Sequence, residues 1–407
     1  MQVTQLLWDA TCTWRLAPSV EHSPSHPTEG WPALVGGTSE PQSAEPTDAQ
    51  LVLVFGDRPT LSDHAVVGEA LAALRLRYPN AAVVCCSGGG QISGVDVLDD
   101  ALVASVIRLD HGSIIAAATT HAPDENSADA GARLASELPP RGLRYVMVLS
   151  DGLRVNGSAL VRGMTAALPD DVTLSGGLAA DSGDFAATLV GLDETPVPGR
   201  IVAIGFYGER LAVAHGSLGG WEMFGPDRLV TRSVGNVVHE LDGQPALALY
   251  KRYLGSFADG LPASALLFPI CLKTHEGAQT GLVRTVLGVS ELENTMTFAG
   301  DVPEGTCVRL MRTSREELVA GAEGAAVAAR RALGGIEPSL VLLVSCIGRR
   351  LVLKHRVEEE VETAFDAMGS SAVFAGFYSF GEIAPSEPDG MSALHNQTMT
   401  VTAVAER

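Results

Sequence analysis

The chain lacks any long apolar run and carries few positive charges. No window reaches the roughly 18 consecutive apolar residues that a membrane-spanning helix needs, and residues 1–20 lack a basic start followed by an apolar stretch. Lys and Arg total 28 against 48 Asp and Glu, a formal net charge of -20. Because a polyanionic surface repels nucleic acid and anionic lipid, we expect a cytoplasmic protein that binds neither nucleic acid nor a membrane.

Motifs for metal binding and for nucleophilic catalysis are also missing. The six cysteines are scattered without a C-x-x-C pair, which argues against a disulfide framework or a zinc site. The ten histidines form no H-E-x-x-H motif. The segment GFYSFG has Phe377 where the G-x-S-x-G motif requires glycine. An enzyme of unknown reaction, hydrolysis for example, is an alternative hypothesis for the function. It would need a nucleophile and a base within roughly 2.6–3.2 Å, and the sequence reveals no such pair.

The length allows two or three domains, since the chain has 407 residues, 46% of them hydrophobic. Residues 17–48 are rich in Pro, Ser, Glu, Thr and Gly without an apolar period, which is typical of a flexible linker. We expect a short strand and this linker within residues 1–49, a first α/β domain at 50–238 and a second at 239–407.

A strand–helix–strand pattern occurs three times, and each occurrence ends in a glycine-bearing turn. The turns are CCSGGGQI (85–92) in unit A, GGLAADSG (176–183) in unit B and GFYSFGEI (376–383) in unit C. Regular spacing of this kind indicates a repeated architecture, and a degraded fourth unit is expected around the helix at 244–255. We predict an α/β fold of repeated strand–helix–strand units plus β-hairpins, forming two related lobes.

Two of these turns allow more than one interpretation. SGGGQISG (87–94) is rich in glycine but lacks the lysine of a phosphate-binding loop, so a tight turn with positive φ is the alternative to nucleotide binding. In GFYSFGEI, three aromatic rings can form an apolar wall while Tyr378, Ser379 and Glu382 orient a ligand. The alternative is a turn that closes the core, with Glu382 bonded to backbone amides.

Arg349 follows the first strand of unit C in the segment SCIGRR (345–350). A guanidinium is suited to bind a carboxylate or phosphate. Since Arg349 and Glu382 follow the two strands of one unit, both are expected at the carboxyl edge of the sheet, where open α/β sheets bind ligands. The alternative is that Arg349 pairs with the glutamates at 358–360 on the surface.

Several segments together resemble the FIST proteins, a sensory family with an N-terminal and a C-terminal FIST domain. They are GGLAAD (176–181), GSLGGW (216–221), GNVVHELDGQPALALY (235–250), FAGDVPEGTCVRL (298–310), SCIGRR (345–350), GFYSFGEIAP (376–385) and the late Asn396-x-Thr398. The resemblance implies a sensor of small ligands, with amino acids proposed, that signals to kinases, cyclases or chemoreceptors. Some members are described as haem-binding sensors of nitric oxide.

The resemblance implies a stand-alone sensor of intracellular signal transduction for an amino acid or similar charged metabolite. The sequence shows no fused output domain, so we expect a separate signalling output protein as partner. The expected ligand-binding residues are Arg349, Tyr378, Ser379, Glu382, Gly176, Gly177, Asp181 and Asn396. We expect no cofactor. A haem sensor, the alternative, would need an axial ligand, for which the candidates are His275, Cys346 and His355.

Overall fold

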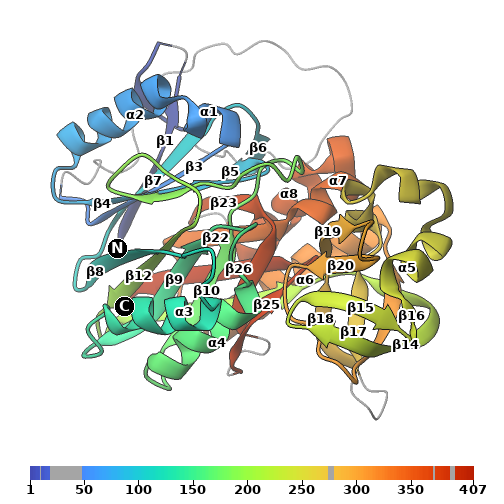
Figure 1. Cartoon of the computed structure of the whole chain (residues 1–407). Coiled ribbons are helices and arrows are strands. Elements are labelled where there is room, and N and C mark those ends of the chain that lie inside the picture. The colour runs from blue at the N-terminus through green and yellow to red at the C-terminus, as the bar shows by residue number, and fades with distance from the viewer. Residues whose placement is uncertain (10, 19–47, 274–278, 370–371, 386–389) are drawn as a thin grey trace.

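The computed structural model describes most of the chain, in four β-sheets with helices packed around them (Figure 1). The described residues are 1–9, 11–18, 48–273, 279–369, 372–385 and 390–407. Most of the linker predicted at residues 17–48 lies outside them. Within the described part, every helix is too short or too polar to cross a membrane.

Three of the sheets have six strands each and are built around one strand–helix–strand unit. Sheet 1 contains, in spatial order, β11 (Val190–Leu192), β4 (Ala82–Ser87), β3 (Leu51–Gly56), β7 (Leu102–Arg108), β1 (Gln2–Trp8) and β2 (Trp14–Leu16). Sheet 2 contains β25 (Ser392–His395), β24 (Gly381–Pro385), β10 (Thr173–Leu178), β9 (Leu143–Ser150), β12 (Arg200–Tyr207) and β8 (Ser113–Thr120). Sheet 3 contains β13 (Leu211–Leu218), β26 (Met399–Glu406), β22 (Leu340–Cys346), β23 (Val373–Ser379), β5 (Gln91–Ser93) and β6 (Asp96–Leu98).

The two strands of each unit are parallel neighbours, β3 with β4, β9 with β10 and β22 with β23. Parallel neighbours need a crossover connection, which here contains helices. The connections are α1 (Arg58–Ser62) and α2 (His64–Arg77) in unit A, α4 (Gly157–Ala167) in unit B, and α7 (Ile347–Leu353), η3 (Lys354–Arg356) and α8 (Glu358–Met368) in unit C. Two further helices, α3 (Ser127–Ser136) and α6 (Arg315–Ala332), pack against α4 and α8.

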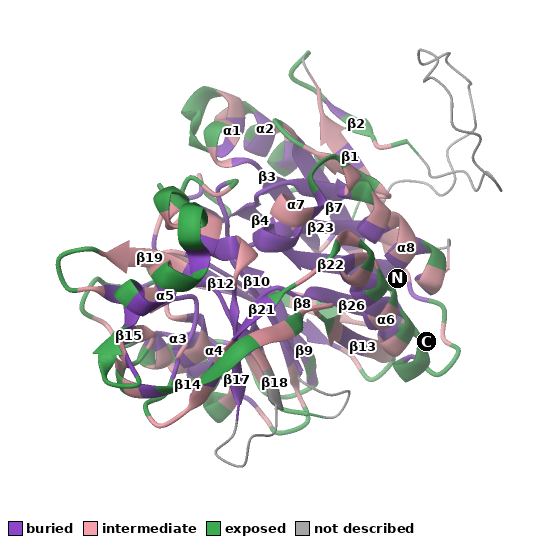
Figure 2. Cartoon of the chain, turned by 90° about the vertical axis from the view of Figure 1, so that its right-hand side faces the viewer, coloured by how far each residue is buried: buried purple, intermediate pink, exposed green. Residues whose placement is uncertain are grey.

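Local sequence explains where these helices and strands form. The side chain of Asp63 accepts hydrogen bonds from the first backbone amides of α2, and Asn156 does the same for α4, as expected of residues preferred at helix N-caps. Ser314 and Glu317 form a capping box at the start of α6. The first strands β3 and β22 are buried along their whole length and are apolar apart from Ser345 in β22, as expected of parallel strands covered on both faces. These central strands are purple in Figure 2.

The three units exchange strands in a closed cycle. After the turn of unit A, β5 pairs antiparallel with β23 of unit C. After the turn of unit C, β24 pairs antiparallel with β10 of unit B. After the turn of unit B, β11 pairs antiparallel with β4 of unit A. Each six-stranded sheet is therefore completed by a strand from a neighbouring unit.

A fourth sheet lies beside these three, at the right of Figure 1, where it packs against α5 (Ala246–Leu254). Its strands are β18 (Gln279–Arg284), β17 (Ile270–Lys273), β21 (Cys307–Arg312), β14 (Glu222–Val234), β15 (Val237–Leu241), β20 (Thr295–Phe298) and β19 (Val286–Ser290), with β16 (Gln244–Pro245) paired to β15. Two short 3-10 helices follow α5, η1 (Gly255–Gly260) and η2 (Ala263–Leu267). Every strand pair of this sheet in the described part is antiparallel.

The predicted α/β fold with repeated strand–helix–strand units and hairpins is confirmed. The predicted fourth unit is built differently, because the described strands around α5 form no parallel pair. The helix predicted at 244–255 forms as α5, and the strands β19 and β20 that follow it pair as a hairpin. Periodicity of single segments does not determine which strands become neighbours.

We predict that Gly176 tolerates no side chain. It adopts φ +142°, and a Cβ there would lie 1.9 Å from the carbonyl oxygen of Val148 on the neighbouring strand. Gly176→Ala should lower the free energy of unfolding by about 3 kcal/mol or more, combining overpacking with backbone strain. Denaturant titration of both proteins measures this difference.

The control for that prediction is Gly68→Ala. Gly68 lies inside α2 with no atom within 4 Å of the added Cβ. Alanine there should stabilise the protein by about 0.5–1 kcal/mol, since glycine disfavours a helix interior. Equal effects of the two substitutions would contradict this account of Gly176.

Candidate functional site

The glycine-bearing turns of the three units meet at the centre of the molecule and bond to one another through the backbone. Ala180 N donates to Ser87 O at 2.9 Å, Gly89 N donates to Tyr378 O at 2.8 Å, and Phe380 N donates to Leu178 O at 3.1 Å. Each turn thus contacts the other two.

The glycine-rich turn of unit A is closed by packing. A Cβ on Gly89 would lie 2.4 Å from the side chain of Ile347, and one on Gly88 would lie 2.9 Å from Phe377. Gly90 has φ +134°, a conformation that glycine adopts readily. These glycines allow tight packing and leave no room for a phosphate, which favours the tight-turn interpretation.

Arg349 is fully buried and pairs with Glu360 of α8. Its Nε and Nη2 donate to Glu360 Oε2 at 2.9 and 2.7 Å, and Nη2 also donates to Leu318 O at 2.7 Å. Nη1 donates to Gly219 O. Arg349 pairs with Glu360 rather than with Glu382, since the first turn of α8 brings Glu360 to the guanidinium. The alternative prediction, in which Arg349 pairs with the glutamates at 358–360, named the correct partner. It placed that partner at the surface, whereas Glu360 is 0% exposed.

The carboxylate of Glu360 has further partners within unit C. Tyr378 Oη donates to Glu360 Oε1 at 2.6 Å, and Ser345 Oγ donates to the same oxygen at 2.9 Å. Burial, followed by the charge of Glu360, raises the pKa of Tyr378 well above its ordinary value. Removing one partner of such a buried, bonded charge is costly, so Arg349, Glu360 and Tyr378 form one structural network.

Glu382 belongs to a separate buried group with Ser379 and Thr398. Ser379 Oγ donates to Glu382 Oε1 at 2.6 Å, while the backbone N–H and the hydroxyl of Thr398 donate to Oε2 at 3.1 and 3.0 Å. Burial raises the pKa of Glu382 to about 8, although these hydrogen bonds act in the opposite direction. Glu382 and Ser379 are each 0% exposed.

The residues predicted in unit B support the central turns. Gly177 lies opposite Glu382 in the pairing of β10 with β24, and a Cβ on Gly177 would lie 2.7 Å from the side chain of Val344. The carboxylate of Asp181 accepts backbone N–H groups from Phe185, Ala186 and Ala187. Asp181 therefore fixes the loop that follows its turn.

Asn396 and Gln397 join the central units to sheet 4. Asn396 Oδ1 accepts from Thr285 N at 3.3 Å and its Nδ2 donates to Phe380 O at 3.4 Å. Gln397 Nε2 donates to Leu266 O at 2.8 Å and to Thr285 Oγ1 at 3.1 Å. Both side chains are fully buried. We call residues 394–398 the junction segment.

The structure thus brings the predicted residues together as a packed centre. None of the eight lines either of the two hollows described next. Their polar atoms are bonded to one another and to the backbone, which is the arrangement that buried polar groups require.

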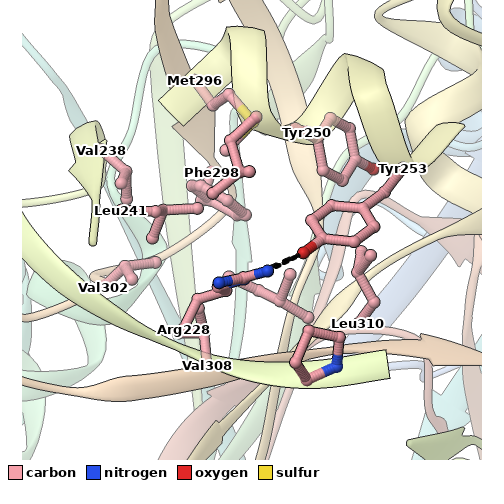
Figure 3. Close-up of a pocket in the computed structure, with 13 residues that line it drawn as sticks. Arg228, Val238, Leu241, Tyr250, Tyr253, Met296, Phe298, Val302, Val308 and Leu310 are labelled. Atoms are coloured by element: carbon pink, nitrogen blue, oxygen red, sulfur yellow. Dashed lines mark hydrogen bonds between the residues drawn. The ribbon is translucent and has the colours of Figure 1, made fainter. Parts of the chain in front are cut away.

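The first hollow is a small apolar cavity between α5 and sheet 4 (Figure 3). Its volume is about 30 Å³, close to what one water molecule needs. Arg228 and Tyr253 lie at its edge, where Arg228 Nε donates to Tyr253 Oη at 3.0 Å. The cavity is lined by Pro226, Arg228, Val238, Leu241, Leu249, Tyr250, Tyr253, Ile270, Met296, Phe298, Val302, Val308 and Leu310. It is too small for an amino acid, so we interpret it as a packing void.

The second hollow is an open groove of about 880 Å³ between α4 and the start of the junction segment. We call it the α4 groove. It is lined by Ser158, Val161, Arg162, Thr165, Ala166, Leu168, Pro169, Asp170, Asp171, Val172, Thr173, Leu174, Arg284, Gly390, Met391, Ser392, Ala393 and Leu394. Its volume falls in the usual range for small-molecule sites.

Arg284 gives the α4 groove a buried positive charge. It is 3% exposed, and it donates only to uncharged oxygens. These are the backbone carbonyls of Asp301, Val283 and Leu394 and the hydroxyl of Ser158. Among the described residues no carboxylate lies within ion-pair distance of it. Burial lowers the pKa of Arg284 to about 10, so the guanidinium is protonated near neutral pH.

Sequence reasoning missed Arg284, although one signal was present. The residue lies in the apolar stretch GLVRTVLGV (281–289), and a charge inside a buried strand is rarely without a partner or a role. Arg284 is also next to Thr285, which bonds to Asn396 and Gln397. The junction segment therefore contacts both the wall of the α4 groove and the predicted centre.

The residues of the catalytic and haem alternatives lie in the packed centre, at the surface or outside the described residues. Ser379 Oγ and Glu382 are within the distance of a nucleophile–base pair, which sequence had not revealed, but both are buried away from the α4 groove. Cys346 is buried and His355 is exposed, and neither lines a described hollow. His275 lies outside the described residues. Within them, no cluster of three or more His, Cys, Asp or Glu side chains could hold a metal.

The fold and the closed centre define an α/β protein of three strand-exchanging units with an antiparallel sheet beside them. Two family models match the sequence, the FIST N domain over residues 50–244 and the FIST C domain over residues 246–385. These cover most of the chain, which therefore belongs to the FIST family. FIST domains are associated with sensing in signal transduction.

Comparison with solved structures gives distant similarities. The chain is similar to cyanuric acid hydrolase from A. caulinodans, with 12% identity and a TM-score of 0.36 over 89% of this chain and 92% of that one. A second cyanuric acid hydrolase structure gives 12% identity and a TM-score of 0.31 with the same coverage. At these TM-scores the similarity supports no conclusion on activity. No curated protein matches the sequence.

We predict that Glu382 makes the protein less stable as pH rises toward 8. Its folded pKa of about 8 exceeds the ordinary value of 4.5, so the folded state retains a proton that the unfolded state releases in between. The stabilisation is complete below about pH 4.5 and declines up to about pH 8. Glu382→Gln should remove this slope, changing its free energy of unfolding relative to the wild type by on the order of 3 kcal/mol between about pH 5 and 8.

The matched control is Glu359→Gln. Glu359 is partly exposed, and its hydrogen bond with Arg356 lowers its pKa, so its titration lies below this window. The slope between about pH 5 and 8 should stay as in the wild type. Denaturant titrations at several pH values measure the free energy of unfolding of both variants and the wild type. If its dependence on pH is the same in Glu382→Gln as in the wild type, Glu382 is ionised in the folded protein.

We predict that filling the small cavity stabilises the protein and leaves ligand binding unaffected. Val308→Ile adds one methylene beside the void, worth about 0.8 kcal/mol if it is accommodated. Val341→Ile, in the fully buried strand β22, should be destabilising because no void is available. Thermal melts compare the two. A Val308→Ile protein that folds but no longer responds to a ligand would identify the cavity as the binding site.

Proposed function

We propose that the protein is a sensor that binds a small charged metabolite, an amino acid or a similar compound, in the α4 groove. The observation that carries this proposal is Arg284, a buried cation without a described carboxylate partner in the wall of an open groove. A ligand carboxylate would supply that missing charge, and charged hydrogen bonds in a partly desolvated site are strong.

The groove also offers negative charge. Asp170 and Asp171 line it and are exposed, so an ammonium group on the same ligand would meet carboxylates. Apolar side chains, among them Leu168, Leu174 and Leu394, supply the rest of the lining. This combination supports the proposal of a zwitterionic ligand with an apolar portion.

The position of the groove suggests how binding could be passed on. Arg284 bonds to Leu394, and the next residue, Thr285, bonds to Asn396 and Gln397. Thr398 in turn bonds to Glu382. Movement of Arg284 upon binding would be felt in the central turns through this junction segment. We propose that a separate output protein reads that change, which comparative pull-downs with and without ligand would test.

The proposal predicts that Arg284→Lys abolishes the thermal response to ligand. A ligand at 100 times its dissociation constant raises the free energy of unfolding by about 2.7 kcal/mol, so a thermal-shift screen of amino acids and related metabolites finds it. Lysine keeps the charge but loses the fork of donors. Affinity should fall by about 2–5 kcal/mol if the site is desolvated.

Arg162→Lys is the matched control in the same groove. The Arg162 side chain is 62% exposed, and loss of its ion pair with Asp301 should change affinity by at most about 1 kcal/mol. If Arg284→Lys binds as the wild type does, the α4 groove is not the site. An absorption band near roughly 400 nm in the purified protein would instead favour the haem alternative.

A further inference from the structure

The hydrogen bonds of Arg284 leave one of its donors unused. A guanidinium has five N–H groups. Nε donates to Asp301 O at 3.0 Å, Nη1 donates to Val283 O at 2.9 Å and to Leu394 O at 3.0 Å, and Nη2 donates to Ser158 Oγ at 3.3 Å. Within the described part of the chain the second N–H of Nη2 has no acceptor.

The hydroxyl group of Ser158, next to Arg284, also has a proton that is not donated to a described residue. Its Oγ accepts from Arg284 Nη2 at 3.3 Å and from Asp301 N at 3.2 Å. A hydroxyl oxygen has two acceptor positions and one proton, and both acceptor positions are occupied. The proton is not donated to any residue that the structure describes, and Ser158 lines the α4 groove.

The two donors are held in place by close packing. A Cβ on Gly300 would lie 2.4 Å from Ser158 Oγ and 3.1 Å from Arg284 Nε. Only glycine therefore allows the backbone at residue 300 to lie this close to the two side chains. The carboxylate of Asp301 is turned to Asn156 and Arg162, at 2.7 and 3.0 Å, so it acts on the guanidinium by its charge alone and forms no ion pair with it. Ser158 lies in the first turn of α4, where the helix dipole favours negative charge.

We propose that the free N–H of Arg284 and the hydroxyl of Ser158 form a two-donor seat for the oxyanion group of the ligand, a carboxylate or a phosphate. Two neighbouring donors on a fixed cation match two oxygens of one anionic group, which is the geometry of bidentate recognition. The inference rests on the proposed function, because it assigns one end of the ligand in the α4 groove. It also makes Ser158 a residue that determines specificity.

Matched acids and amides test this assignment. Acetate with acetamide, glycine with glycinamide, and inorganic phosphate are titrated into the full chain by calorimetry, using wild type and Ser158→Ala. We expect acids to bind more tightly than their amides, and Ser158→Ala to weaken the acids about tenfold, or about 1.4 kcal/mol. Ser158→Thr, which retains the hydroxyl, should restore binding. Acid-selective and phosphate-selective binding separate the two oxyanion sources, and each supports the seat.

Some outcomes would overturn the seat while leaving the groove intact. One such outcome is that Arg284→Lys loses binding while the wild type binds amides as tightly as acids. Another is that Ser158→Ala binds acids as tightly as the wild type does. In either case a ligand occupies the groove without using this seat. If no probe binds and no metabolite of the screen shifts the melt, both the seat and the proposed function fail. Melts of the unliganded variants show whether Ser158→Ala is folded.

Discussion

The exchange of strands among the three units is the constraint on which the rest of the structure depends. Each sheet is completed by a strand that follows another unit's turn, and the backbone bonds among Ser87, Tyr378 and Leu178 hold those turns together. Because the turns must lie this close, they carry glycines, and most of their buried polar side chains are hydrogen-bonded. The centre is packed in this way, and the open groove lies at the side, against α4.

Burial of charge follows from the same geometry. Arg349 and Glu360 satisfy each other at the centre, with Tyr378 and Ser345 completing the carboxylate's partners. A buried ion pair of this kind contributes little net stability, but loss of one member leaves an uncompensated charge. Arg284 differs because its described partners are uncharged oxygens. The contrast between the two arginines separates a residue that holds the fold from one that can bind a ligand.

Sequence could predict the repeated units because buried parallel strands are long apolar runs and the turns between them need glycine. It could not predict that the turns of units B and C meet, because this contact depends on the antiparallel pairing of β10 with β24. It could not assign the partner of Arg349, because the choice between Glu360 and Glu382 depends on how α8 packs. Arg284 was missed for a related reason: its environment comes from α4, residue 301 and the junction segment, which are distant from one another along the chain.

The strand exchange has a consequence for how the polypeptide can be divided and how it folds. Sheet 3 combines β5, β6 and β13 from the FIST N region with β22, β23 and β26 from later in the chain, and sheet 2 receives β24 and β25 from the same later part. Recombinant halves cut between the two matched regions would each expose unpaired strand edges, which favour aggregation. Native pairing must also wait for contacts far apart in sequence, which slows folding. The evolutionary modules of this family are therefore not its folding modules.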